Sequence, residues 1–145
     1  MTGGDARALL ARTPLTVRLG PFALASWAPA QVSAVSAAAL RSHSDVALWM
    51  RDDLEVTALL RESALASAPP PRHAQRGWAL LTLDQPMDWE VTGVLAAVSG
   101  ALAAAGIPIG AVTAFARDHV LVPVDRLDEA LAALSAVCGE VRRLD

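Results

Sequence analysis

The 145-residue chain contains no lysine, no asparagine and no tyrosine, and Cys138 is its only cysteine. Without lysine there is neither a Schiff-base nucleophile nor the lysine of a phosphate-binding P-loop. A lone cysteine forms no intrachain disulfide and no cysteine metal cluster, which is typical of a reducing compartment. Residues 1–14 carry charges where a secretory signal needs an apolar run. The sequence therefore predicts a cytoplasmic protein without a metal or other cofactor.

Basic charge is equally sparse, because all twelve basic residues are arginines scattered along the chain and the net charge is −3. Nucleic-acid binding requires clustered cations that neutralise phosphates, so we expect no nucleic-acid partner. The apolar fraction of 54% is ample for a core, and the length suits one domain or two small ones. The histidines show no metal-ligand spacing.

One uncharged run, residues 91–116, is longer than the roughly 20 residues that a membrane-spanning helix requires. It consists mostly of small residues, and Gly106 and Pro108 interrupt it. A helix followed by a buried strand explains the run better, so we expect no membrane contact.

The second half of the chain predicts the order strand, helix, strand, strand, helix, strand. The strands are expected at 78–83, 109–115, 119–123 and 141–144, with helices at 94–105 and from Asp125. Asp88 or Thr92 is the expected cap of the first helix, Asp125 caps the second, and Gly106 ends the first. The second helix has an apolar face at Leu127, Ala130, Leu131, Leu134 and Cys138. This βαββαβ order predicts an α+β, ferredoxin-like fold with both helices on one face of an antiparallel sheet.

The first half of the chain predicts a shortened copy of the same unit. Strands are expected at 15–19 and 22–27 around a turn at Gly20-Pro21, and 31–41 is ambiguous between helix and strand. Residues 44–60 resemble 117–134 at an offset of 73, at which Asp45, Leu48, Asp52 and Leu54 fall on Asp118, Leu121, Asp125 and Leu127. This predicts a strand followed by a helix in both and no counterpart of helix 94–105. We therefore expect two tandem units, 1–68 and 77–145, joined by a proline-rich linker at 69–76.

Two segments resemble a known family: DQPMDWEVTGVLAAVSGALAAAGIPI at 84–109 and TAFARDHVLVPVDRLDEALAAL at 113–134. In order and spacing they are similar to the ACT domain, in particular to the tandem-ACT group of small bacterial proteins related to the arginine-sensing CASTOR proteins. The resemblance implies a module that senses amino acids or similar small molecules. The ligand would lie at the interface of two ACT units, against the strand-to-helix turn of one. That turn begins Asp84-Gln85-Pro86 where the group has Gly-Pro, and Ala116-Arg117 replaces a threonine-containing turn, which points to an altered ligand or to none.

An amino-acid zwitterion needs an acid near its ammonium group and free N–H donors near its carboxylate. A helix N-terminus supplies such donors. Trp89 either stacks on a ligand or anchors an interface, and Met87 is expected to pack. The resemblance implies that residues 109–113 and Asp118 face the turn. For the acids the simpler alternative is that Asp88 is an N-cap and Asp118 a turn residue. The predicted ligand-binding residues are Asp84, Met87, Asp88, Trp89, Thr92, Gly93, Val94, Ile109, Thr113 and Asp118.

These observations leave three interpretations open. The first is a non-enzymatic regulatory protein with an amino-acid ligand. The second is a structural or interaction module without a ligand, which oligomerises through its uncovered sheet, for example as a homodimer. The third is a small enzyme that uses Asp118 and His119 as an acid–base pair.

Overall fold

The computed structural model describes residues 3–42 and 46–145. Its elements are α1 (Gly3–Ala11), β1 (Leu15–Trp27), η1 (Pro29–Gln31), α2 (Val32–Ser42), β2 (Leu48–Arg51), β3 (Val56–Arg61), η2 (Glu62–Ser67), β4 (His73–Leu83), α3 (Val94–Ala104), β5 (Gly110–Thr113), β6 (Asp118–Pro123), η3 (Val124–Arg126), α4 (Leu127–Leu134) and β7 (Val141–Arg143). They form two compact units. Unit 1 comprises residues 1–19 and 79–145, and unit 2 comprises residues 20–78.

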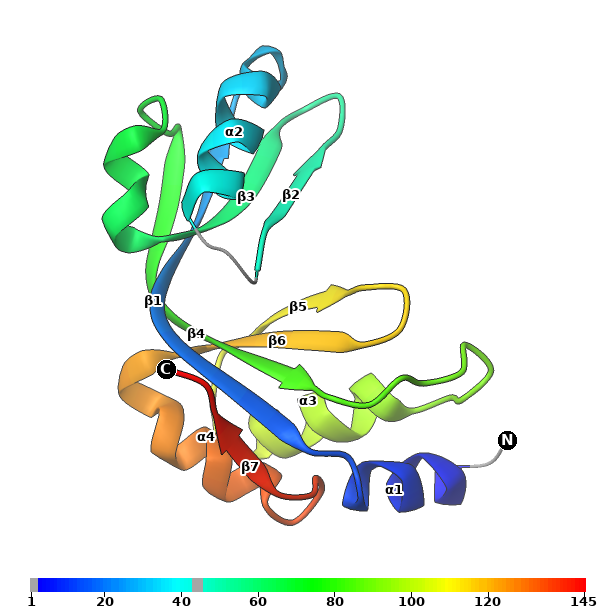
Figure 1. The fold of residues 1–145 in the computed structure, drawn as a ribbon. Helices are drawn as coiled ribbons and strands as arrows, with labels where there is room; N and C mark the ends of the chain where they lie inside the picture. The colour runs from blue at the N-terminus through cyan, green and yellow to red at the C-terminus, as the bar shows by residue number, and fades with distance from the viewer. Residues whose placement is uncertain (1–2, 43–45) are drawn as a thin grey trace. The chain divides into compact units, whose positions relative to one another are not determined.

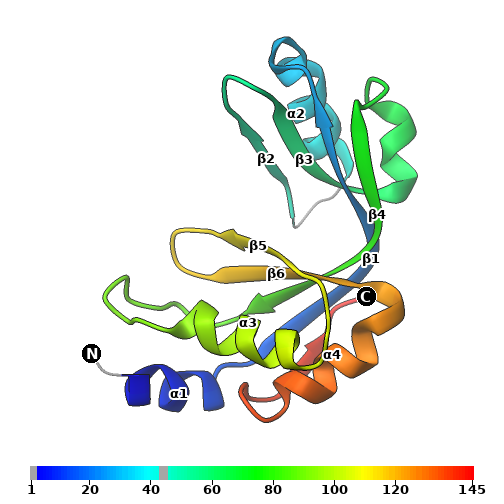
Figure 2. The ribbon, with the colours of Figure 1, turned by 180° about the vertical axis from the view of Figure 1, so that it is seen from behind.

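Unit 1 is a sheet with its helices on one face. The strand order is β7-β1-β4-β6-β5, in which β7 runs parallel to β1 and β5 antiparallel to β6. Figures 1 and 2 show α1, α3 and α4 on the same side of these strands. The core lies between the two layers, because alternate strand residues bury their side chains there, as in any sheet with one covered face.

The helices of unit 1 form where the apolar spacing predicts them. In α3 the buried residues Val94, Val98 and Leu102 recur every four positions, which places them on one face. Gly106 adopts a left-handed φ of 69° just beyond the helix, as a C-terminal glycine does. In α4 the buried residues include Leu127 and Leu134, as expected. Asp125 does not cap α4: it lies in η3, and no side chain of the described residues caps that helix.

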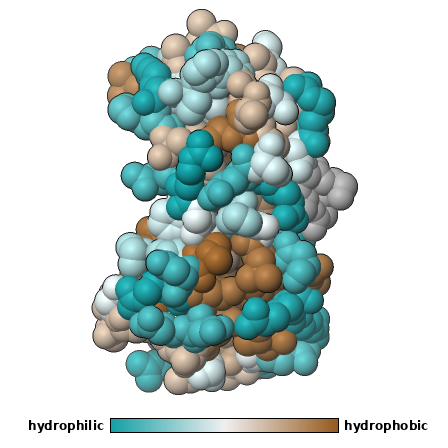
Figure 3. All heavy atoms as spheres, turned by 90° about the vertical axis from the view of Figure 1, so that its left-hand side faces the viewer, coloured by the Kyte–Doolittle hydropathy of each residue, from teal (hydrophilic) through white to brown (hydrophobic). Residues whose placement is uncertain are grey.

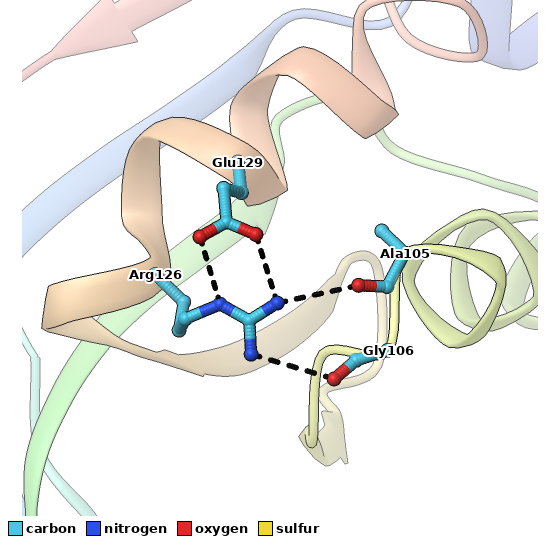
Figure 4. A network of polar contacts seen from close by, with 4 residues as sticks. All are labelled: Ala105, Gly106, Arg126 and Glu129. Carbon is cyan, nitrogen blue, oxygen red and sulfur yellow. Dashed lines mark hydrogen bonds and ion pairs between the residues drawn. The ribbon is translucent and has the colours of Figure 1, made fainter.

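Arg126 joins the end of α3 to the start of α4 (Figure 4). Its guanidinium donates two hydrogen bonds to Glu129, of 2.9 and 2.8 Å. It also donates to the carbonyl oxygens of Ala105 at 3.3 Å and Gly106 at 3.5 Å. These carbonyls belong to the end of α3, where backbone acceptors lack partners within the helix. A positive charge there also complements the helix dipole.

Unit 2 repeats the strand order of a ferredoxin-like unit. Its strands lie in the order β2-β3-β1-β4, with β3 antiparallel to both β1 and β2. The buried side chains of α2 pack against this sheet. Trp27 is fully buried in this core, and its indole Nε1 donates a 2.6 Å hydrogen bond to the carbonyl oxygen of Pro69.

Three expectations for the first half are wrong. The turn expected at Gly20-Pro21 does not end a strand, because β1 continues from Leu15 to Trp27 with Gly20 at a φ of 75°. The helix expected in the second part of 44–60 does not form. Its place is taken by β3, because Val56, Ala58 and Leu60 alternate toward one core. Asp52 closes the preceding turn by accepting from the amides of Leu54 and Glu55.

The third correction concerns the shortening. A counterpart of the long helix does exist, since α2 and α3 both have 11 residues. The shortening falls instead on the second helix, where unit 2 has the six-residue η2 in place of α4. Part of the expected linker is also ordered as strand, because His73–Arg76 belong to β4.

The fold class is confirmed as α+β and ferredoxin-like, with one departure in unit 1. The expected final strand, β7, pairs with β1 and not with β4. The place beside β4 is taken by β1, the first strand of the chain. The two strands run antiparallel there, since the amide of Asp84 at the end of β4 donates to the carbonyl of Pro14 before β1. Residues of β1 thus complete the sheet that the second half of the chain begins.

Hydrophobic side chains also reach the surface of unit 1. Figure 3 shows brown residues gathered among teal ones at the level of α4 and the C-terminal end. Val141 and Leu144, at that end of the chain, are among the exposed large hydrophobic residues. No helix in the described part of the chain is long and apolar enough to cross a membrane.

Candidate functional site

A pocket of about 300 Å³ lies within unit 1, between the turn 84–93, the first turn of α3 and the tip of the β5–β6 hairpin. Seven of the ten predicted residues line it: Met87, Asp88, Trp89, Gly93, Val94, Thr113 and Asp118. Asp84, Thr92 and Ile109 do not. Seven lining residues were not predicted: Val91, Leu95, Ala96, Ala114, Phe115, Ala116 and Arg117.

Two contacts hold the turn 84–93 against the hairpin. The amide of Met87 donates to the carbonyl oxygen of Ala116 at 3.0 Å. Nη1 of Arg117 donates to Oδ1 of Asp84 at 2.6 Å. The bonded residues are 29 and 33 positions apart in the sequence, so these contacts bring the two walls of the pocket together.

The start of α3 lines this pocket through Val94, Leu95 and Ala96. Gly93 is the N-cap at a φ of 91°, a conformation that residues with a Cβ rarely adopt. No side chain of the described residues caps the helix, so the expectation that Asp88 or Thr92 does so is wrong. The first helical amides have no partner within a helix, and Ala97 is the first that donates back, to Gly93. The helix N-terminus therefore presents donors and a partial positive charge.

The three predicted acids have different surroundings. Oδ1 of Asp118 accepts a 2.8 Å hydrogen bond from Oγ1 of Thr113, directly across the hairpin. Asp88 is exposed, and its backbone carbonyl accepts from the amide of Val91. Asp84 points elsewhere: its carboxylate accepts from Arg117 and from Oγ1 of Thr16 at 2.9 Å. These two bonds, the first above all, lower the pKa of Asp84.

Two aromatic rings meet at the pocket. The centroids of Trp89 and Phe115 are 5.8 Å apart with an interplanar angle of 57°. The two residues are 68% and 84% exposed. The sequence indicates Trp89 as a candidate ligand contact, whereas it predicts Phe115 at the end of a strand. The position of Phe115 directly before the predicted turn 116–118 is the feature of the sequence that indicates its place at the tip of the hairpin.

The remaining predicted residues are accounted for by packing or exposure. Ile109 is half-buried and packs against the core of unit 1, and Thr92 is exposed in the turn.

A second hollow of about 390 Å³ lies on the α1 side of the turn. Met87, Asp88 and Val91 line this hollow as well as the pocket.

Asp118 and His119 do not form an acid–base pair at the pocket. Asp118 lines it, whereas successive strand residues point to opposite faces, and Nδ1 of His119 lies 2.9 Å from Oγ1 of the buried Thr82. Burial, with the charges of Arg117 and Arg18, lowers the pKa of His119. Among the described residues no group of three or more acids, histidines or cysteines is arranged to hold a metal ion.

Several solved structures share this fold. A protein from Agobacterium tumefaciens is 21% identical, with a TM-score of 0.74, over 92% of this chain and 95% of its own. A Vibrio cholerae protein of unknown function, described as a possible transport protein, is 20% identical over 91% of this chain and 95% of its own, with a TM-score of 0.64. The regulatory subunit of aspartate kinase from Thermus thermophilus is 15% identical over 85% and 95% of the two chains, with a TM-score of 0.62. At sequence identities this low, the similarity shows a shared fold and does not show a shared function.

No curated protein matches the chain. The family model described as the ACT domain matches residues 73–136, a little less than half of the chain. The matched segment runs from the start of β4 to just beyond α4 and includes the turn, the α3 start and the hairpin that line the pocket. The segment 73–136 is therefore similar to the ACT domain, and the chain shares its fold with a regulatory subunit of aspartate kinase.

Proposed function

We propose that this chain is a regulatory protein that binds an amino acid in the pocket beside the start of α3. ACT domains are in general regulatory domains that bind small molecules such as amino acids. The matched ACT segment holds the whole lining of the pocket. A volume of about 300 Å³ is at the lower end of the roughly 300–1,000 Å³ of small-molecule sites, which suits a ligand of this size.

The observation that carries the proposal is that the residues which open α3 and two acidic residues line one pocket. The amides of Val94, Leu95 and Ala96 offer donors to a ligand carboxylate. Asp88 and Asp118 line the same pocket, and in this proposal their carboxylates accept from an ammonium group. Asp84 is not an ammonium partner in this proposal, because Arg117 already neutralises it.

Regulation would follow from a shift between arrangements of the turn 84–93. A ligand that bridges the α3 start and the hairpin stabilises the arrangement in which both are correctly spaced, and it shifts the population toward that state. Three further points remain predictions: a second ACT unit that covers the ligand, the tandem division into 1–68 and 77–145, and the relation to the CASTOR group.

A thermal-shift screen of the twenty amino acids tests the proposal. A ligand at 100 times its dissociation constant stabilises the folded chain by about 2.7 kcal/mol, which raises the melting temperature by several degrees. Asp88→Ala is expected to reduce that shift strongly. Asp53→Ala removes an exposed acid of the β2–β3 turn and serves as the matched control. Absence of any shift, or equal shifts in both variants, contradicts the proposed site.

A second candidate function is an interaction module without a ligand. Its support is the set of exposed large hydrophobic side chains, which includes Leu40, Met50 and Leu54 of unit 2 as well as Trp89 and Phe115. Sedimentation of the chain at increasing concentration distinguishes the two functions. Self-association that no amino acid alters, together with a flat thermal-shift screen, favours the module.

A further inference from the structure

Trp89 and Phe115 form an aromatic pair between two segments that belong to different parts of the chain. Trp89 belongs to the turn that precedes α3, and Phe115 belongs to the tip of the β5–β6 hairpin. Both residues line the pocket, and their rings are in van der Waals range at a tilted angle. Both are largely exposed, although the removal of large apolar side chains from water is favourable.

The placement of the rings is fixed by polar contacts on both sides of them. The bond from the Met87 amide to the Ala116 carbonyl holds the backbones next to Trp89 and Phe115 together. The Arg117–Asp84 ion pair adds a second tie one residue further along the hairpin. The two rings therefore meet because the backbone segments that carry them are tied.

The charged residues that line the pocket are Asp88, Arg117 and Asp118. Arg117 is paired with Asp84, which leaves the two carboxylates of Asp88 and Asp118 for the ammonium group of the ligand. The side chains of Met87, Val91 and Leu95 line the same pocket and extend the apolar surface of the rings. A ligand side chain that lies on this surface binds more tightly in proportion to the apolar area that it buries. A charged side chain binds less well there, because it loses its hydration.

We propose that Trp89 and Phe115 are the specificity-determining residues of the pocket, and that they select an amino acid with a large uncharged apolar or aromatic side chain. This inference rests on the proposed function, since it names the class of ligand for the same site. The amides of α3 and the carboxylates of Asp88 and Asp118 hold the charged groups common to all amino acids. The two rings then decide between ligands by the area that each side chain buries against them.

Titration calorimetry of the full chain with L-phenylalanine, L-leucine, L-alanine, L-glutamate and L-arginine tests the inference. We expect L-phenylalanine and L-leucine to bind at least about tenfold more tightly than L-alanine, because single apolar groups discriminate by roughly 10–200-fold in such pockets. The charged amino acids are expected to bind more weakly than L-leucine. Tightest binding of L-arginine, L-glutamate or L-alanine overturns the inference and leaves the proposed function intact.

Substitutions then assign the selectivity to the rings. Trp89→Ala and Phe115→Ala are each expected to weaken L-phenylalanine binding about tenfold while L-alanine binding changes little. Trp89→Phe is expected to retain most of the selectivity, since it keeps an aromatic face. Trp49→Ala, which removes a 40% exposed tryptophan of β2 outside the pocket, is the matched control and is expected to have no effect.

Each remaining outcome is decisive. All three aromatic residues are partly or largely exposed, so the variants are expected to fold, and circular dichroism verifies this. Unchanged selectivity in Trp89→Ala and Phe115→Ala overturns the inference alone. No binding of any of the five amino acids to the unmodified chain overturns the proposed function together with the inference. Loss of self-association in Trp89→Ala, measured by sedimentation, would assign the rings to an interface and overturn the inference.

Discussion

Arg117 and Asp84 form an ion pair with 2.6 Å between Nη1 and Oδ1, although 33 residues separate them in the chain. The other carboxylate oxygen of Asp84 accepts from Thr16 of β1. One acid thereby connects the hairpin of the pocket, the end of β4 and the first strand. Asp84 thus has a positioning role, which distinguishes it from Asp88 and Asp118.

We expect Asp84→Ala to destabilise unit 1 by about 1 kcal/mol at neutral pH, because the pair is partly exposed and such pairs are worth about 0.2–1 kcal/mol. The lowered pKa of Asp84 means that its contribution is present above the ordinary carboxyl value of 3.8 and is lost as the pH falls through the lowered pKa. Urea denaturation of Asp84→Ala, Arg117→Ala and the double variant measures the coupling. Additive effects of the two substitutions would show that the pair contributes nothing.

His119 is expected to make the free energy of unfolding depend on pH at higher pH values than Asp84 does. Its pKa is lowered from 6.5 in the folded chain, chiefly by burial, so the unfolded chain binds the proton more readily. The contribution of the neutral His119 to the free energy of unfolding should be complete above pH 6.5. It should fall as the pH drops from 6.5 toward the lowered pKa. His119→Gln should flatten this slope between pH 5 and 7, whereas the exposed His73→Gln should preserve it. Equal slopes in both variants would contradict the assignment.

Arg126 is expected to stabilise the junction of α3 and α4 through geometry as well as charge. Arg126→Ala removes the paired bonds to Glu129 and the bonds to the carbonyls of Ala105 and Gly106. Arg126→Lys keeps the charge but cannot reproduce the planar fork. We expect the melting temperature to fall in the order wild type, Arg126→Lys, Arg126→Ala, with faster amide exchange at the end of α3. Identical behaviour of Lys and wild type would show that charge alone matters.

Cys138 is expected to be inert in the folded chain. It is 7% exposed, and burial raises the pKa of its thiol to about 11. At pH 8 about one thiol in a thousand is then ionised, and the thiolate is the reactive form. Labelling with a thiol reagent should be slow in buffer and fast in urea. Labelling at the rate of a free cysteine without denaturant would contradict the buried placement.

Local patterns predicted the second half of the chain well because its elements are defined by short-range spacing. The four-residue repeat of Val94, Val98 and Leu102 predicts α3, and Gly106 predicts its end. Seven of the ten predicted residues line one pocket, because a strand-to-helix turn and a neighbouring hairpin are both visible as sequence segments. The first half failed where alternation and helical spacing compete, as at Val56–Leu60.

By itself the sequence determined most helices and strands of the segment 73–136 and indicated the two segments that line the pocket, since periodicity and glycine placement act over a few residues. The tertiary structure alone decided that β1 lies beside β4, that β7 pairs with β1, and that Asp84 is bound to Arg117 while Trp89 meets Phe115. These are pairings between residues far apart in the chain. Strand order and side-chain partners of that kind depend on the packing of the whole unit, and no local pattern specifies them.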